Sequence, residues 1–177
     1  MAAPDIAAAL QRVSAVLERR PEAGLHDDAP ATAHWEGDTR FVASHPNGRQ
    51  VSTDMPLEFG GAGDQVTPGW LFRAGLASCT ATCIAMNAAS EGIALRVLVV
   101  RATSRSDTRG MLGMADTNGT TVPAAPHDVQ LHVRIAADGV PPERLRALVE
   151  RSHRQSPVPC AVRTEMPLAV QVKVDVD

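Results

Sequence analysis

The stretch "TPGWLFRAGLASCTATCIAMNAASEGI", residues 67–93, is rich in Ala, Ser and Thr and carries signals for a helix at both ends. Thr67 and Pro68 supply a hydroxyl suited to an N-cap and a proline suited to the first helical position. Glu91 and Gly92 supply the stop, because glycine readily takes the left-handed conformation after a helix. We therefore predict a helix of about 24 residues, ~36 Å long at 1.5 Å per residue, as the central element of the fold.

This helix also holds Arg73 and Asn87, which indicates a buried helix rather than a membrane span. Charged residues make up 21% of the 177-residue chain and the formal net charge is -3, so no strong field is available to bind nucleic acid or an anionic membrane. The opening residues, "MAAPDIAAALQRV", lack a basic region followed by a long apolar run. We expect a cytoplasmic protein with neither a membrane nor a nucleic-acid partner.

The chain has three cysteines, which are either packing residues or redox groups. Cys79 and Cys83 are four residues apart, so their Cβ atoms would lie roughly 5–6 Å apart in a helix, whereas a disulfide requires ~3.8 Å. Cys79 is either a reactive thiol or a small apolar filler, because cysteine is among the most buried residue types. Cys160, which follows two prolines, is either a redox partner presented by a bend or another packed thiol.

The segments before the central helix alternate in character. Apolar residues at helical spacing predict an amphipathic helix over residues 5–20, and the polar, Pro-bearing residues 21–30 predict a connector. Residues 31–44 predict two short strands around a turn at 36–38, and a second turn at 46–48 leads into a third strand, "RQVSTDMP". The glycine-rich residues 55–69 predict a loop.

After the central helix, "LRVLVVRATSRS" and "HDVQLHVRIAA" alternate apolar and polar residues and predict two strands, joined by a connection over residues 107–125. "PPERLRALVERSH" predicts a helix, Ser156 and Pro157 open a short helical turn, and "LAVQVKVDV" predicts a terminal strand. This order of elements indicates an α+β protein rather than repeated βαβ units.

No other chemistry has a specific pattern in this chain. The six histidines are scattered without ligand spacing and there is no C-x-x-C pair. Glycine-rich phosphate loops and the G-x-S-x-G nucleophile elbow are also missing. We expect no metal and no other cofactor, and thiol chemistry is the only specific enzymatic signal.

Two segments, "GGAGDQVTPGWLFRAGLASCTA" and "RSHRQSPVPCAV", together with the valine-rich terminal strand, resemble the OsmC/Ohr family of thiol peroxidases. The resemblance runs from about His34 to Val174. It implies an α+β OsmC-like fold in which antiparallel sheets surround long central helices in an intertwined homodimer. Residues 1–30 would be an N-terminal helix and connector, and residues 31–177 a single OsmC-like domain. The substrate would be an organic hydroperoxide and the electron donor a dithiol.

The resemblance also implies site residues. The peroxidatic cysteine falls on Cys79, within "ASCTA". The resolving cysteine falls on Ser156, whose hydroxyl cannot form a disulfide. Cys160 lies one helical turn further on, and we take it as the candidate resolving cysteine because residues four apart share a helix face.

Two activating groups of the family are replaced in this chain. The family carboxylate corresponds to Gly69. The family arginine, in the turn between the first two strands, corresponds approximately to Pro46, and Arg49 is the candidate that could take its role. Their replacement favours a second hypothesis, a non-catalytic or small-ligand-binding member of the same fold. Met111, Leu112 and Met114 either wall an apolar substrate pocket or pack within a hairpin.

Overall fold

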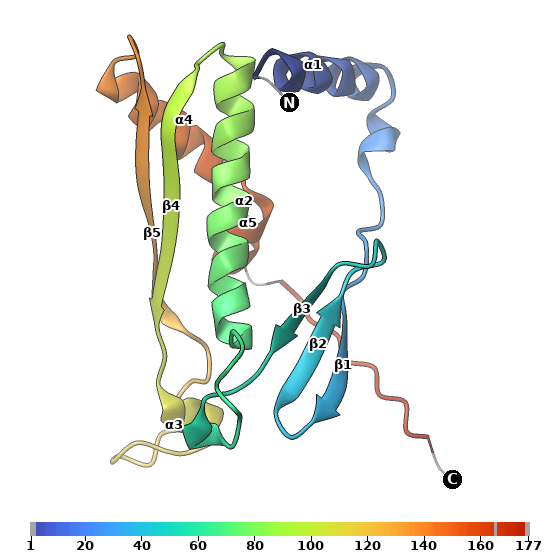
Figure 1. The fold of residues 1–177 in the computed structure, drawn as a ribbon, viewed down its shortest axis with the longest axis vertical. Coiled ribbons are helices and arrows are strands. Elements are labelled where there is room, and N and C mark those ends of the chain that lie inside the picture. The colour runs from blue at the N-terminus through green and yellow to red at the C-terminus, as the bar shows by residue number, and fades with distance from the viewer. Residues whose placement is uncertain (1–2, 165, 176–177) are drawn as a thin grey trace.

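The computed structural model describes residues 3–164 and 166–175 and is organised around one long helix, α2 (Pro68–Ser90) (Figure 1). The Thr67 side chain caps α2 by accepting a hydrogen bond from the backbone N–H of Trp70 at 3.2 Å. Gly92 follows the helix with a φ of +67°, a conformation that favours glycine. The predicted central helix is confirmed. In the described part of the chain no helix combines the length and the apolar composition needed to cross a membrane.

The other predicted helices and strands are present over residues 3–163. The elements before α2 are helix α1 (Ala3–Arg19), the 3-10 helix η1 (Pro21–Gly24), strands β1 (Thr32–Gly37), β2 (Arg40–Ser44) and β3 (Gln50–Thr53), and the 3-10 helix η2 (Leu57–Phe59). The elements after α2 are strands β4 (Leu95–Arg105) and β5 (His127–Ala137) and helices α3 (Thr108–Met111), α4 (Pro142–Arg154) and α5 (Pro157–Arg163). The α+β prediction is therefore confirmed.

Two small antiparallel sheets lie on opposite sides of α2 (Figure 1). One is the meander β1-β2-β3, and the other is the long hairpin of β4 and β5. Helix α1 contacts α2, and Figure 1 shows it extending away from the C-terminal end of that helix. Helices α4 and α5 also contact α2.

The hydrophobic core lies between the C-terminal half of α2, helix α4 and the β4–β5 hairpin. It consists of five buried aliphatic residues: Ile84, Ala88, Ile93, Leu145 and Leu148. In α2 the buried positions Leu76, Thr80, Ile84 and Ala88 recur every four residues. This spacing gives α2 one buried stripe, since residues four apart lie on the same face of a helix.

The predicted terminal strand is wrong for the described residues. Residues 166–175 form no strand among the parts of the chain that the structure describes, and Val176, the last residue of the predicted strand, lies outside them. Leu168, Val170, Val172 and Val174 alternate along this segment and are between 74% and 90% exposed. Alternation of apolar and polar residues favours a strand, but a strand forms only where its backbone N–H and C=O groups can hydrogen-bond to a neighbouring strand.

Candidate active site

Cys79 lies near the middle of α2, between two buried residues of its own helix, Leu76 and Thr80. Thr80 Oγ1 donates a hydrogen bond to the Leu76 carbonyl oxygen at 2.9 Å, so this hydroxyl is used within the helix. Cys79 is a free, half-buried thiol. Within the described ranges no hydrogen bond to its sulfur is present. The sulfur is therefore available for chemistry but is not held by a neighbouring donor.

The junction between α4 and α5 contacts α2 one turn beyond Cys79. The Cys83 Sγ atom lies 3.9 Å from the Gln155 carbonyl oxygen. Asn87 Nδ2 donates to Gln155 Oε1 at 2.8 Å and to Ser152 Oγ at 3.0 Å. These contacts hold the junction against the face of α2 that carries Cys83 and Asn87.

Cys160 lies in α5 and is directed toward the same junction. Its Sγ atom donates to the Arg154 carbonyl oxygen at 3.1 Å. Cys83 and Cys160 therefore contact the carbonyl oxygens of adjacent residues, Gln155 and Arg154. Sequence spacing could not have indicated this proximity, since it depends on how α5 packs on α2.

Ser156, the residue at the position of the family's resolving cysteine, has a structural role. It is fully buried, and its hydroxyl donates to the Ser152 carbonyl oxygen at 2.8 Å. Ser152 repeats the pattern by donating to the Leu148 carbonyl oxygen at 2.7 Å. Both hydroxyls thus continue the backbone pattern of α4 into the junction.

Arg49 lies after the turn that joins β2 to β3, and it is exposed. The turn between the first two strands is formed by residues 37–40, and Pro46 lies in the next turn, which joins β2 to β3. The correspondence of the family arginine with Pro46 stays a prediction. Both turns contain a glycine with positive φ, Gly37 and Gly48. The arginine nearest the first turn is Arg40.

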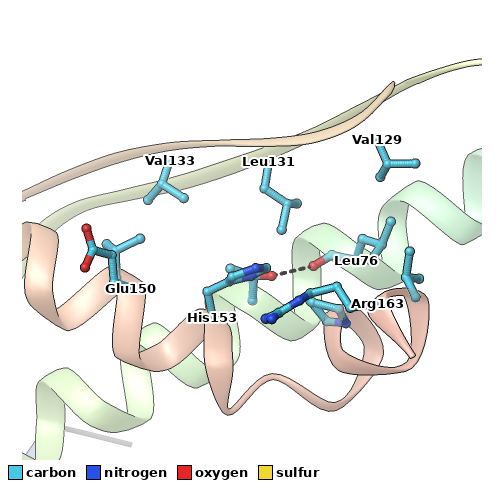
Figure 2. A pocket seen from close by; sticks show the side chains of 11 residues that line it. Leu76, Val129, Leu131, Val133, Glu150, His153 and Arg163 are labelled. Atoms are coloured by element: carbon cyan, nitrogen blue, oxygen red, sulfur yellow. Dashed lines mark hydrogen bonds between the residues drawn. The ribbon is translucent and has the colours of Figure 1, made fainter. Parts of the chain in front are cut away.

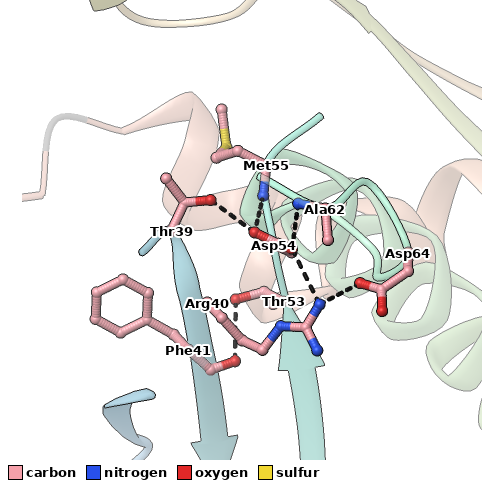
Figure 3. A network of polar contacts seen from close by, with 8 residues as sticks. All are labelled: Thr39, Arg40, Phe41, Thr53, Asp54, Met55, Ala62 and Asp64. Carbon is pink, nitrogen blue, oxygen red and sulfur yellow. Dashed lines mark hydrogen bonds and ion pairs between the residues drawn. The ribbon is translucent and has the colours of Figure 1, made fainter. Parts of the chain in front are cut away.

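Arg40 belongs to a polar network that joins the β1–β2 turn to the loop after β3 (Figure 3). At its centre is the Asp54 carboxylate, whose side chain is 2% exposed. Four donors reach it: Thr39 Oγ1 at 2.6 Å, Met55 N at 2.8 Å, Ala62 N at 2.9 Å and Arg40 Nη2 at 3.2 Å. These hydrogen bonds, that from Thr39 first, hold the pKa of Asp54 well below its ordinary value. Arg40 also pairs with Asp64, so its guanidinium is already engaged.

An apolar cavity of about 410 Å³ lies beside the Cys79 segment of α2. Leu76 and Thr80 line it from α2, and Figure 2 shows Val129, Leu131 and Val133 of β5 facing His153 and Arg163 across it. Cys79 itself is not a lining residue. The cavity therefore lies beside the thiol rather than around it.

A second apolar cavity, of about 580 Å³, lies at the N-terminal end of α2. It is lined by the loop after β3, the first turns of α2 and the β4–β5 connection, and it is open to solvent on one side. Met111, Leu112 and Met114 are all exposed, and of the three Met111 alone lines this cavity. The predicted apolar wall is therefore formed by one of the three residues.

The histidines do not assemble a metal site in the described residues. No group of three or more His, Cys, Asp or Glu side chains lies close enough together there to hold a metal ion. His132 Nε2 instead lies 3.4 Å from Thr103 Oγ1 across the β4–β5 hairpin, and His153 lines the cavity of Figure 2.

The chain is similar to known proteins in both sequence and fold. Residues 61–171, more than half of the chain, match the sequence profile of a family described as OsmC-like protein. No curated protein matches the chain.

Solved structures with a similar fold include three bacterial proteins. An OsmC-like protein from Mycoplasma pneumoniae is 16% identical, with a TM-score of 0.65 over 80% of this chain and 91% of that chain. An OsmC-like protein of unknown function from Vibrio cholerae is 14% identical, with a TM-score of 0.62 over 79% and 96%. An organic hydroperoxide resistance protein OsmC from Legionella pneumophila is 22% identical, with a TM-score of 0.57 over 78% and 91%.

Proposed function

The chain belongs to the OsmC-like protein family, and from this premise we propose that it reduces organic hydroperoxides through the thiol of Cys79. The observation that carries the proposal is the place of Cys79 on the central helix, half-buried and without a hydrogen-bond partner in the described residues. A relative of the same fold, from Legionella pneumophila, is named as an organic hydroperoxide resistance protein.

The proposed reaction begins with attack by the Cys79 thiolate on one peroxide oxygen. The O–O bond breaks, the alcohol leaves after taking up a proton, and the sulfur becomes a sulfenic acid. The Cys160 thiol then attacks this sulfur, so that a disulfide forms and water leaves. A dithiol donor reduces the disulfide by two thiol exchanges and is itself oxidised to a disulfide.

The packing of α5 supports Cys160 as the resolving thiol. Helix α5 contacts α2 and has only seven residues, so it is a short element beside the helix that carries Cys79. To reach Cys79, the Cys160 thiol must leave the Arg154 carbonyl oxygen. That single hydrogen bond is a weak restraint, because thiols are weak donors.

We assign the activation of Cys79 to Arg49. Its side chain is exposed, and within the described residues it pairs with no carboxylate, unlike that of Arg40. A cation near a thiolate stabilises the charged form. The Arg49→Gln change should therefore slow alkylation of Cys79 by iodoacetamide at neutral pH, and an unchanged rate would remove Arg49 from the mechanism.

A homodimer is part of this proposal. Trp35, Phe41 and Val51 share one face of the three-stranded sheet by strand register, and all three are exposed. The alternating apolar residues of 166–175 are exposed as well. Exposed apolar surface of this kind marks an interaction site, and a second copy of the chain would cover both regions.

The deciding experiment is steady-state turnover of cumene hydroperoxide with a dithiol donor. Wild type should turn over and Cys79→Ser should not, whereas Cys83→Ser, the third cysteine, should retain the wild-type rate. Loss of multiple turnover in Cys160→Ser, with one equivalent of peroxide still consumed, would assign the resolving step. Equal rates for wild type and Cys79→Ser would overturn the proposal.

A non-catalytic member of the fold is the second candidate. It is favoured by Gly69, which offers no carboxylate at the start of α2, and by the lack of a donor to the Cys79 sulfur among the described residues. This candidate predicts alkylation of Cys79 at the rate of an ordinary thiol and no peroxide consumption.

A further inference from the structure

We propose that the 580 Å³ cavity at the start of α2 binds a small apolar molecule with a carboxylate group, and that Arg73 pairs with this carboxylate. The proposal concerns a site that Cys79 does not line, so it holds whether or not Cys79 reduces peroxides.

Arg73 is a partly buried cation with no anionic partner among the residues that the structure describes. Three arginines of the described chain are partly buried: Arg40, Arg73 and Arg151. Arg40 pairs with two aspartates and Arg151 with Glu91, but Arg73 forms no ion pair within the described ranges. Its Nη1 atom only donates to Ser104 Oγ, at 3.4 Å. A guanidinium has five N–H donors, so most of those of Arg73 remain free for a ligand.

Gly69 leaves open the space in which a carboxylate would meet Arg73. A Cβ atom built on Gly69 would lie 3.8 Å from Arg73 Nη1 and 3.9 Å from Thr67 Oγ1, with no closer contact. Gly69, Arg73 and Thr67 all line the cavity. An acidic side chain at position 69 would have been an i,i+4 partner for Arg73, and glycine at this position supplies no carboxylate and leaves room for one from a ligand.

The rest of the cavity fits an apolar body. Its apolar lining comes from three segments: Met55, Pro56 and Phe59 after β3, Phe72 in α2, and Met111 and Pro126 in the β4–β5 connection. A volume of about 580 Å³ lies within the range of roughly 300–1,000 Å³ typical of small-molecule sites. One charged group in a mostly apolar pocket is the arrangement that fixes the orientation of an amphiphilic ligand.

The acidic group of the cavity does not neutralise Arg73. Asp107 lines the cavity, but its carboxylate pairs with Arg109 at 2.6 Å and accepts the Arg109 backbone N–H at 3.0 Å. The bond from Arg109 lowers the pKa of Asp107 to about 2, so it stays ionised and engaged at neutral pH. Among the described residues that line this cavity, Arg73 is therefore left as an uncompensated charge.

The test uses the full chain with Cys79→Ser, which removes the proposed thiol chemistry, and measures octanoate binding by titration calorimetry. Octanoate should bind at one site, whereas octanamide, which has the same chain and no charge, should bind at least tenfold more weakly. The Arg73→Gln change should weaken octanoate binding by roughly 10- to 100-fold, since a hydrogen bond to a charged group is lost. Equal affinities for octanoate and octanamide, or undetectable binding of octanoate, would overturn the proposal.

Matched variants separate charge from packing. Gly69→Glu should abolish octanoate binding by supplying the carboxylate internally, whereas Gly69→Gln, of nearly equal size, should retain more of it. Ser104→Ala removes the hydrogen bond to Arg73 without its charge, and Arg101→Gln removes an exposed arginine of β4 outside the cavity; both should bind octanoate as the parent does. Equal loss in Gly69→Glu and Gly69→Gln, with unchanged thermal melting, would contradict the charge argument.

Discussion

The Cys83 sulfur lies 3.9 Å from the carbonyl oxygen of Gln155, so the junction of α4 and α5 contacts α2 one helical turn beyond Cys79. Cys160 contacts the adjacent carbonyl, that of Arg154. The α2 thiol that contacts the junction is thus Cys83 and not the proposed nucleophile, Cys79. Two pairings, Cys79 with Cys160 and Cys83 with Cys160, can be distinguished by experiment.

The first prediction is that oxidation joins Cys160 to Cys79. One equivalent of cumene hydroperoxide without a reductant should give this disulfide, because only the sulfur that attacks the peroxide becomes the electrophile for a second thiol. Peptide mapping under non-reducing conditions would identify the link, and Cys79→Ser should give none. A link between Cys83 and Cys160 in wild type would instead assign the peroxidatic role to Cys83.

The second prediction concerns acid stability and Asp54. The pKa of this carboxyl is lowered in the fold, so it stabilises the protein at pH values above its unfolded pKa of ~3.9, and this contribution is lost as the pH falls below ~4 toward the folded value. Asp54→Asn should lower the melting temperature at pH 7 by roughly 5 °C and flatten its fall in acid. Asp138→Asn, at an exposed ion pair with Arg96, is the control and should change little. Parallel acid profiles for wild type and Asp54→Asn would contradict this role.

The parts of the fold that depend on local signals were predictable from sequence. In the structure α2 begins after the cap at Thr67 and ends before Gly92, as predicted. The alternation of apolar and polar residues correctly indicated strands β4 and β5. The strand predicted for the terminal segment is absent from residues 166–175, because a strand needs a neighbouring strand for its backbone hydrogen bonds and the described chain supplies none.

The candidate site was only partly predictable. Cys79 stands out by its place in the central helix, but the contact of Cys83 with Gln155 depends on tertiary packing. The Arg40–Asp54 network joins residues 14 apart, and nothing in their spacing indicates it. Arg73 is visible in the sequence, but which arginines form ion pairs depends on tertiary structure, which among the described residues gives carboxylate partners to Arg40 and Arg151 and none to Arg73.

The third prediction tests the core between α2, α4 and the β4–β5 hairpin. Leu148 is 1% exposed, and truncation to alanine would remove buried apolar atoms and leave a cavity. Leu148→Ala should lower the free energy of unfolding by about 2–5 kcal/mol, measured by urea denaturation. Leu25→Ala, at an exposed position of the connector, should change it by less than about 0.5 kcal/mol. Similar effects for the two variants would show that α4 is not part of the cooperative core.

The fourth prediction tests the proposed dimer through residues 166–175. In an extended segment alternate side chains point to opposite faces, so Val170 and Val172 share one face and Gln171 lies on the other. The double change Val170→Asp and Val172→Asp should convert the dimer to a monomer, because it places charges in the apolar contact. Gln171→Asp adds a charge to the polar face and should leave the dimer intact. Light scattering after size exclusion gives the mass directly, and a dimer that survives the double change would show that this segment is not the contact between copies.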